Sequence, residues 1–80
     1  MEPPPATYQV NGAAIRAIRM RQGLALRETA RAAGISRSYL QRLETGVRRR
    51  MRPDTYAPLR NYLGATDDQL LAREEPTEKR

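Results

Sequence analysis

Apolar residues recur every three or four positions through most of the chain, which is the pattern of helices with one buried face. Polar residues suited to capping precede several of these segments, and glycines follow most of them. The pattern therefore predicts five helices. With their capping residues, they span residues 11–23, 26–33, 36–46, 53–64 and 66–71.

The predicted buried faces are small and mostly aliphatic. In the first helix the stripe consists of Ala14, Ile15 and Ile18, and Leu40 and Leu43 face inward in the third. The inward-facing residues of the last two helices are Tyr56, Leu59, Tyr62, Leu63, Leu70 and Leu71. Within the fourth helix, Pro58 indicates a late start or a bend.

The second and third predicted helices meet at a glycine within the stretch LALRETARAAGISRSYLQRLETG, residues 24–46. Ala30 lies four positions before Gly34 and Ile35 follows it, as a sharp turn between two helices requires. The outer face of the third helix carries hydrogen-bonding side chains, namely Arg37, Ser38, Tyr39, Gln41 and Arg42. A half-exposed helix with these groups suits the major groove of DNA, which indicates a recognition helix.

The composition excludes several classes of function. The chain has no cysteine and no histidine, so disulfides, thiolate nucleophiles, the usual zinc sites and most histidine-based acid–base catalysis are excluded. We therefore expect no enzyme activity, no metal, no cofactor and no small-molecule ligand. No apolar run approaches the roughly 20 residues of a transmembrane helix, and the first five residues, MEPPP, do not resemble a secretory signal. We expect a cytoplasmic protein with no membrane partner.

Positive charge is concentrated on the predicted helices. Residues 11–64 hold twelve arginines against three acids, a net +9 within a chain whose formal charge is +6. This distribution is typical of a protein that binds a polyanion through salt-sensitive phosphate contacts. Basic residues also solvate small domains, so the charge alone favours nucleic acid only modestly.

Four motifs together resemble one known family. They are IRxxR near the start, the A-x3-G-I-S turn, LExG at the end of the third helix and a trailing LG...LL. The chain is similar in these motifs to the helix-turn-helix DNA-binding domain of the lambdoid phage repressor and Cro family, also called XRE-like. The match runs without a gap through residues 12–46 and resumes after a slightly long loop as LRNYLGATDDQLL. A bare helix-turn-helix pattern has many false positives, whereas the joint occurrence of these motifs is far more specific.

The resemblance implies an all-α fold, a compact five-helix bundle containing a helix-turn-helix (lambda repressor-like). The domain would span residues 11–73. The proline-rich residues 1–10 are predicted to form a disordered arm, and residues 74–80 a flexible, mixed-charge tail.

The same resemblance implies a sequence-specific transcriptional regulator of double-stranded DNA, a Cro-like or small repressor that occupies an operator in a bacterium or phage-infected cell. The operator would be dyad-symmetric, and little chain follows the fifth helix, so we expect a weak homodimer that DNA strengthens. Two alternatives remain open. One is the antitoxin of a toxin–antitoxin pair that autoregulates its operon, and the other is an RNA-binding or purely structural helical module.

Base-reading residues are expected on the third helix. Arg37 and Ser38 match the positions that most often reach bases in the family, and Tyr39, Gln41 and Arg42 lie further along the same face. Arginine reads guanine through a planar pair of donors, so Arg37 is the first candidate and Arg42 the second. For Tyr39, contact with a phosphate or a thymine methyl and a role as a surface-packed aromatic are equally good interpretations.

Phosphate-binding residues are expected in two places. The family usually has glutamine at the position of Leu26, which cannot hydrogen-bond, so Arg27 and the helix-terminal amides would hold the DNA backbone there. The segment VRRRMRP follows LETG, where the family contacts the sugar-phosphate backbone. Its expected phosphate ligands are Arg48, Arg49, Arg50 and Arg52.

A structural ion pair is also implied by the resemblance. In the family, the arginine at the position of Arg19 turns inward to pair with the glutamate at the end of the recognition helix, which here is Glu44. Periodicity alone slightly favours two ordinary surface charges. The resemblance reverses that preference.

Overall fold

The computed structural model describes residues 7–72, which contain five helices and one two-stranded sheet. The helices are α1 (Gly12–Arg21), α2 (Leu26–Ala33), α3 (Arg37–Thr45), α4 (Pro53–Leu63) and α5 (Asp67–Leu70). The strands are β1 (Tyr8–Gln9) and β2 (Arg50–Met51). The predicted all-α, five-helix architecture is confirmed, with the small sheet as an addition. Within residues 7–72, every helix is too short or too polar to span a bilayer.

Local capping chemistry explains where the helices begin. The side chain of Asn11 accepts a hydrogen bond from the Ala14 amide at 3.2 Å, and Ser36 accepts one from the Tyr39 amide at 3.0 Å. Ala25 precedes α2 and offers no side-chain cap, as its methyl group dictates. Gly34 ends α2 in the left-handed conformation, φ 74°, which lets the chain turn directly into α3.

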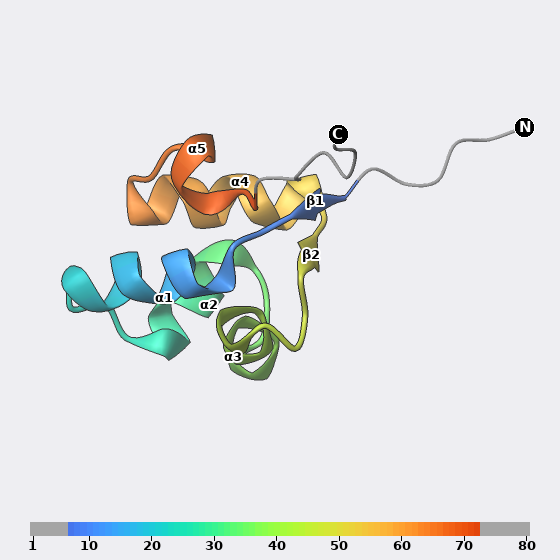
Figure 1. Ribbon diagram of the computed structural model, residues 1–80. Coiled ribbons are helices and arrows are strands. Elements are labelled where there is room, and N and C mark those ends of the chain that lie inside the picture. The colour runs from blue at the N-terminus through green and yellow to red at the C-terminus, as the bar shows by residue number, and fades with distance from the viewer. Residues whose placement is uncertain (1–6, 73–80) are drawn as a thin grey trace, which may run out of the picture.

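The core lies between two groups of helices. Figure 1 shows α4 and α5 together on one side and α1, α2 and α3 on the other. All five helices contribute side chains to one core cluster, whose fully buried aliphatic members are Ile15, Leu40, Leu43, Leu59, Leu63 and Leu70. Burying these side chains is the main stabilisation available to a chain without phenylalanine, tryptophan or disulfides.

The N-terminal strand corrects the predicted domain boundary. Tyr8 pairs with Met51 and Gln9 with Arg50 in the antiparallel sheet, and Val10 is only 4% exposed. On its other side the segment bonds to the C-terminal end of the domain, because the Ala72 amide donates to the Gln9 carbonyl at 2.8 Å. The predicted disordered arm through residue 10 is therefore wrong for residues 8–10. Its first six residues and the predicted tail, 74–80, lie outside the described residues.

Helix α4 departs from the sequence expectation in two details. It begins at Pro53 and continues through Pro58, so the expected late start is wrong. Proline is well tolerated at the first helical position, because its fixed φ suits a helix and its missing donor is not needed there. Tyr62 is 39% exposed rather than buried, since Tyr56, Leu59 and Leu63 already fill the inward face.

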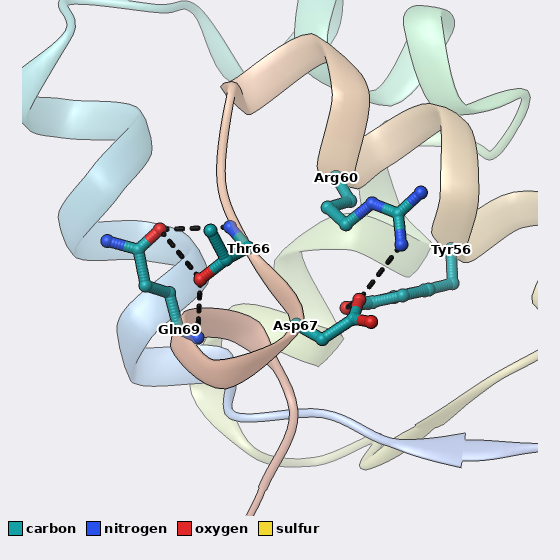
Figure 2. A network of polar contacts seen from close by, with 5 residues as sticks. All are labelled: Tyr56, Arg60, Thr66, Asp67 and Gln69. Carbon is teal, nitrogen blue, oxygen red and sulfur yellow. Dashed lines mark hydrogen bonds and ion pairs between the residues drawn. The ribbon is translucent and has the colours of Figure 1, made fainter.

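The short helix α5 is fixed by polar contacts, which Figure 2 shows from close by. Thr66 and Gln69 form a capping box, with Gln69 accepting from the Thr66 amide at 2.9 Å. Asp67 accepts hydrogen bonds from the Tyr56 hydroxyl at 2.7 Å and from the Arg60 guanidinium at 2.9 Å. These two bonds join α5 to α4. They also lower the pKa of Asp67, the tyrosine contributing most, while burial and the bond to Asp67 raise the pKa of Tyr56.

A pH-dependent stability follows from Asp67. Its folded pKa lies below the unfolded value of 3.8, so its contribution is present at neutral pH and is lost as the pH falls through the folded pKa. We expect Asp67→Asn to lower the melting temperature at neutral pH and to flatten the acid side of the melting-temperature profile. Asp68→Asn, an exposed neighbour, is the matched control and should follow the wild-type profile. Identical acid profiles for Asp67→Asn and the wild type would contradict this role.

Candidate nucleic-acid interface

Helix α3 presents a polar face to solvent. Leu40 and Leu43 are fully buried on its inner side, where α3 packs against α1 and α2. The predicted base-reading residues Arg37, Ser38, Gln41 and Arg42 are all exposed. The structure therefore brings four of the five together on one accessible helix face, with Arg37 at the first helical position.

Tyr39, the fifth predicted base-reading residue, is placed differently. Its side chain is half-buried and packs against the core cluster. Its hydroxyl donates a hydrogen bond to the Arg50 carbonyl at 3.1 Å, and the Arg48 guanidinium carbon lies 5.3 Å from the ring centroid. Of the two interpretations left open by the sequence, the surface-packed aromatic describes these contacts.

The inward-turned ion pair is present. Arg19 donates through Nε to Glu44 Oε2 at 2.7 Å and through Nη2 to Oε1 at 3.0 Å. The two side chains are only 13% and 4% exposed. The remaining guanidinium nitrogen Nη1 donates to the Leu24 carbonyl at 2.8 Å, so the pair links α1, the turn before α2 and the end of α3. The hydrogen bond to Glu44 raises the pKa of Arg19, although burial opposes it.

Gly12 sets how closely α1 approaches α3. A Cβ atom at this position would overlap the carbonyl oxygen of Leu43 and lie 2.8 Å from the carbonyl carbon. Only a residue without a side chain fits there. Sequence reasoning did not single out Gly12, because a glycine at the start of a helix carries no signal about which distant backbone it contacts.

The arginine segment, residues 48–52, lies between α3 and α4 and contains β2. Its four arginines are all exposed, as is Arg27 on α2. Three of them already have weak or exposed partners. Arg50 donates to Thr7 at 3.3 Å, Arg49 to the Gly46 carbonyl at 3.5 Å, and Arg52 to Asp54 at 3.2 Å.

Part of this segment is a strand rather than a free loop, which the sequence did not predict. Met51, the one apolar residue among the arginines, is 1% exposed and anchors β2 to the core. In the sequence, this single apolar residue among the arginines was the one sign that the segment packs against the core. Leu26, where the family usually has glutamine, is half-buried against the core, and Arg27 is the exposed side chain beside it at the start of α2.

Comparison with known proteins agrees with this geometry. The family profile described as "Helix-turn-helix domain" matches residues 12–73, and the chain belongs to this family. Among solved structures it is similar to the clp gene regulator ClgR from Corynebacterium glutamicum. One ClgR crystal structure has a TM-score of 0.63 and 38% identity, with the match covering 69% of this chain and 57% of that one. No curated protein sequence matches the chain significantly.

A second ClgR crystal structure gives a TM-score of 0.61 at 38% identity, with 69% of this chain and 70% of that one covered. The matching part therefore spans little more than half of the first ClgR chain and about two-thirds of the second. Family membership and these likenesses establish a helix-turn-helix domain in this chain. The finer assignment to lambdoid repressors and Cro stays a prediction.

Proposed function

We propose that this protein is a sequence-specific regulator of transcription, a Cro-like or small repressor that occupies an operator in double-stranded DNA and thereby excludes polymerase. The observation that carries the proposal is the exposed polar face of α3 lying next to the arginine segment. A helix of this width enters the major groove, while the neighbouring arginines can neutralise the phosphates that border it.

The two groups of side chains would have separate tasks. Arg37 stands at the N-terminal end of α3, the part of a recognition helix that contacts base edges, and its planar guanidinium can bond guanine twice. Ser38, Gln41 and Arg42 would extend this reading along the groove. Arg27 and the arginines of the segment would bind phosphates, which fixes the register of the helix but carries no sequence information.

Two substitutions test this division. Arg37→Ala should weaken binding to a selected operator and flatten the preference at one base pair, because a bidentate contact is worth about 1–3 kcal/mol of discrimination. Arg50→Ala should weaken all duplexes about equally and reduce the slope of log affinity against log salt by about one. Titration of both variants against the operator and a scrambled duplex at several salt concentrations measures the two effects.

The reverse pattern of effects would show that the roles of α3 and the arginine segment are assigned wrongly. If Arg50→Ala changes base preference and Arg37→Ala does not, the arginine segment reads the sequence and α3 does not. Binding to RNA alone, in parallel titrations with single-stranded and duplex RNA, would contradict the proposed function as a whole.

We further propose that the protein binds a dyad-symmetric operator as a weak homodimer that DNA strengthens. A two-fold pair of helix-turn-helix domains places its recognition helices about 34–36 Å apart, one turn of DNA. Footprinting should therefore show two protected half-sites related by a dyad at that spacing. A single protected half-site at saturating protein would indicate a monomeric reader.

A further inference from the structure

Tyr39 occupies a position between the polar face of α3 and the core. It is the third residue of the helix, half-buried, with its ring packed against the core cluster and its hydroxyl directed at β2. Of the five residues that the sequence predicted to read bases, it is the one whose polar side-chain atom has a hydrogen-bond partner among the described residues.

Three contacts join α3 to the arginine segment, and two of them involve Tyr39. Its hydroxyl donates to the Arg50 carbonyl at 3.1 Å, and the Arg48 guanidinium lies over its ring at 5.3 Å from the centroid. The third is a backbone bond from the Arg48 amide to the Arg42 carbonyl at 3.0 Å. The ring thus fixes a side chain of the segment, and the hydroxyl fixes its backbone two residues later.

The strand register explains why the Arg50 carbonyl is free to accept this bond. In an antiparallel pair, hydrogen-bonded and non-hydrogen-bonded positions alternate. The Val10 amide donates to the Arg49 carbonyl at 2.8 Å, so the adjacent pair of Gln9 and Arg50 falls at the position where both carbonyls turn away from the partner strand. The Gln9 carbonyl accepts from Ala72 on its side, and the Arg50 carbonyl accepts from Tyr39 on the other.

We propose that Tyr39 is a positioning residue that holds the arginine segment against α3, so that phosphate-binding and base-reading side chains meet one duplex in a fixed register. This inference rests on the proposed function. The four arginines within five residues repel one another. Without the contacts of Tyr39, the segment would adopt many conformations in solution. Fixing their backbone before binding removes part of the ordering cost that association would have to meet.

The test compares Tyr39→Phe with Tyr62→Phe. The first removes only the bonding hydroxyl and keeps the ring under Arg48, whereas the second removes an exposed tyrosine hydroxyl on α4, away from the segment. Tyr39→Phe should weaken binding to both a library-selected operator and a scrambled duplex by roughly 3- to 10-fold, the equivalent of one hydrogen bond. The ratio of the two affinities should stay within about 2-fold of wild type, and Tyr62→Phe should change neither affinity.

A second background shows whether the hydroxyl acts through the segment. In the variant carrying Arg48→Ala and Arg50→Ala, two of the four arginines that Tyr39 positions are gone, so adding Tyr39→Phe should weaken binding by a smaller factor than it does in the wild type. An undiminished cost would mean that Tyr39 bonds DNA directly, and a changed preference at one base pair would make it a base reader. Either result would overturn the proposal.

Hydrogen exchange in the protein without DNA separates this inference from the proposed function. The Arg48 amide donates from the segment to the Arg42 carbonyl, and the Val10 amide donates to the Arg49 carbonyl of the segment. Tyr39→Phe should accelerate exchange several-fold at both amides and leave exchange at the Leu40 amide within α3 unchanged. Unchanged rates at Arg48 and Val10, or equal acceleration at Leu40, would overturn the positioning role. A wild-type protein that binds no duplex at all would instead overturn the proposed function, whatever the exchange rates show.

Discussion

Replacing Glu44 with alanine should lower the free energy of unfolding by about 3 kcal/mol, the typical cost of leaving one partner of a desolvated ion pair alone. Arg19 and Glu44 are joined by two hydrogen bonds, 2.7 and 3.0 Å long, and their side chains are 13% and 4% exposed. After the substitution, the guanidinium would keep only its bond to the Leu24 carbonyl. Denaturant titration of the wild type and Glu44→Ala measures the loss directly.

The chain supplies a matched control for this measurement. Arg52 and Asp54 form an ion pair 3.2 Å long whose side chains are 75% and 64% exposed. Because water screens such a pair, Asp54→Ala should cost at most about 1 kcal/mol. If Glu44→Ala costs no more than Asp54→Ala, then Arg19 recovers its solvation in the variant and the pair is not a structural link between α1 and α3.

Local signals explain why the helices could be predicted. Asn11, Ser36 and Thr66 cap their helices through side-chain bonds, and Gly34 turns the chain in the left-handed conformation. Each feature depends on residues within about one helical turn, so it is written into adjacent sequence positions. The buried stripes are local in the same sense, since one face of a helix repeats every 3.6 residues.

The sheet could not be predicted because nothing local specifies it. Strands β1 and β2 have two residues each, and the register joins Tyr8 to Met51 across most of the folded domain. Two residues are too few for an alternating pattern to be recognised. The proline-rich start of the chain also favoured a disordered segment, although Val10 belongs to the core.

The candidate site likewise has some features that the local sequence determines and others that depend on tertiary contacts. The exposed positions of Arg37, Ser38, Gln41 and Arg42 follow from helical periodicity and were expected. The engagement of Tyr39 with Arg50 depends on where β2 lies, and β2 is placed by the buried side chain of Met51 and by pairing with β1. A sequence pattern therefore locates the reading face, whereas the attachment of the arginine segment to that face requires the tertiary structure.

The close approach of α1 to α3 gives the second large effect. Gly12→Ala should destabilise the domain by about 2–3 kcal/mol, as overpacking of a well-packed contact does. The new methyl group would overlap the Leu43 carbonyl oxygen and lie 3.1 Å from the Glu44 Cα. Neither residue can move freely, because the Leu43 side chain is fully buried and Glu44 is bonded to Arg19.

The sign of this change is informative, because helix propensity alone predicts the opposite. Alanine is favoured over glycine within a helix by roughly 0.5–1 kcal/mol, so an unobstructed Gly12→Ala would stabilise α1. Ala13→Gly, at the exposed neighbouring position, calibrates that propensity and should cost no more than about 1 kcal/mol. Denaturant titrations of Gly12→Ala and Ala13→Gly measure the change in the free energy of unfolding that each substitution causes. A Gly12→Ala domain as stable as the wild type, or more stable, would show that α1 and α3 do not meet backbone to backbone at Gly12 and Leu43.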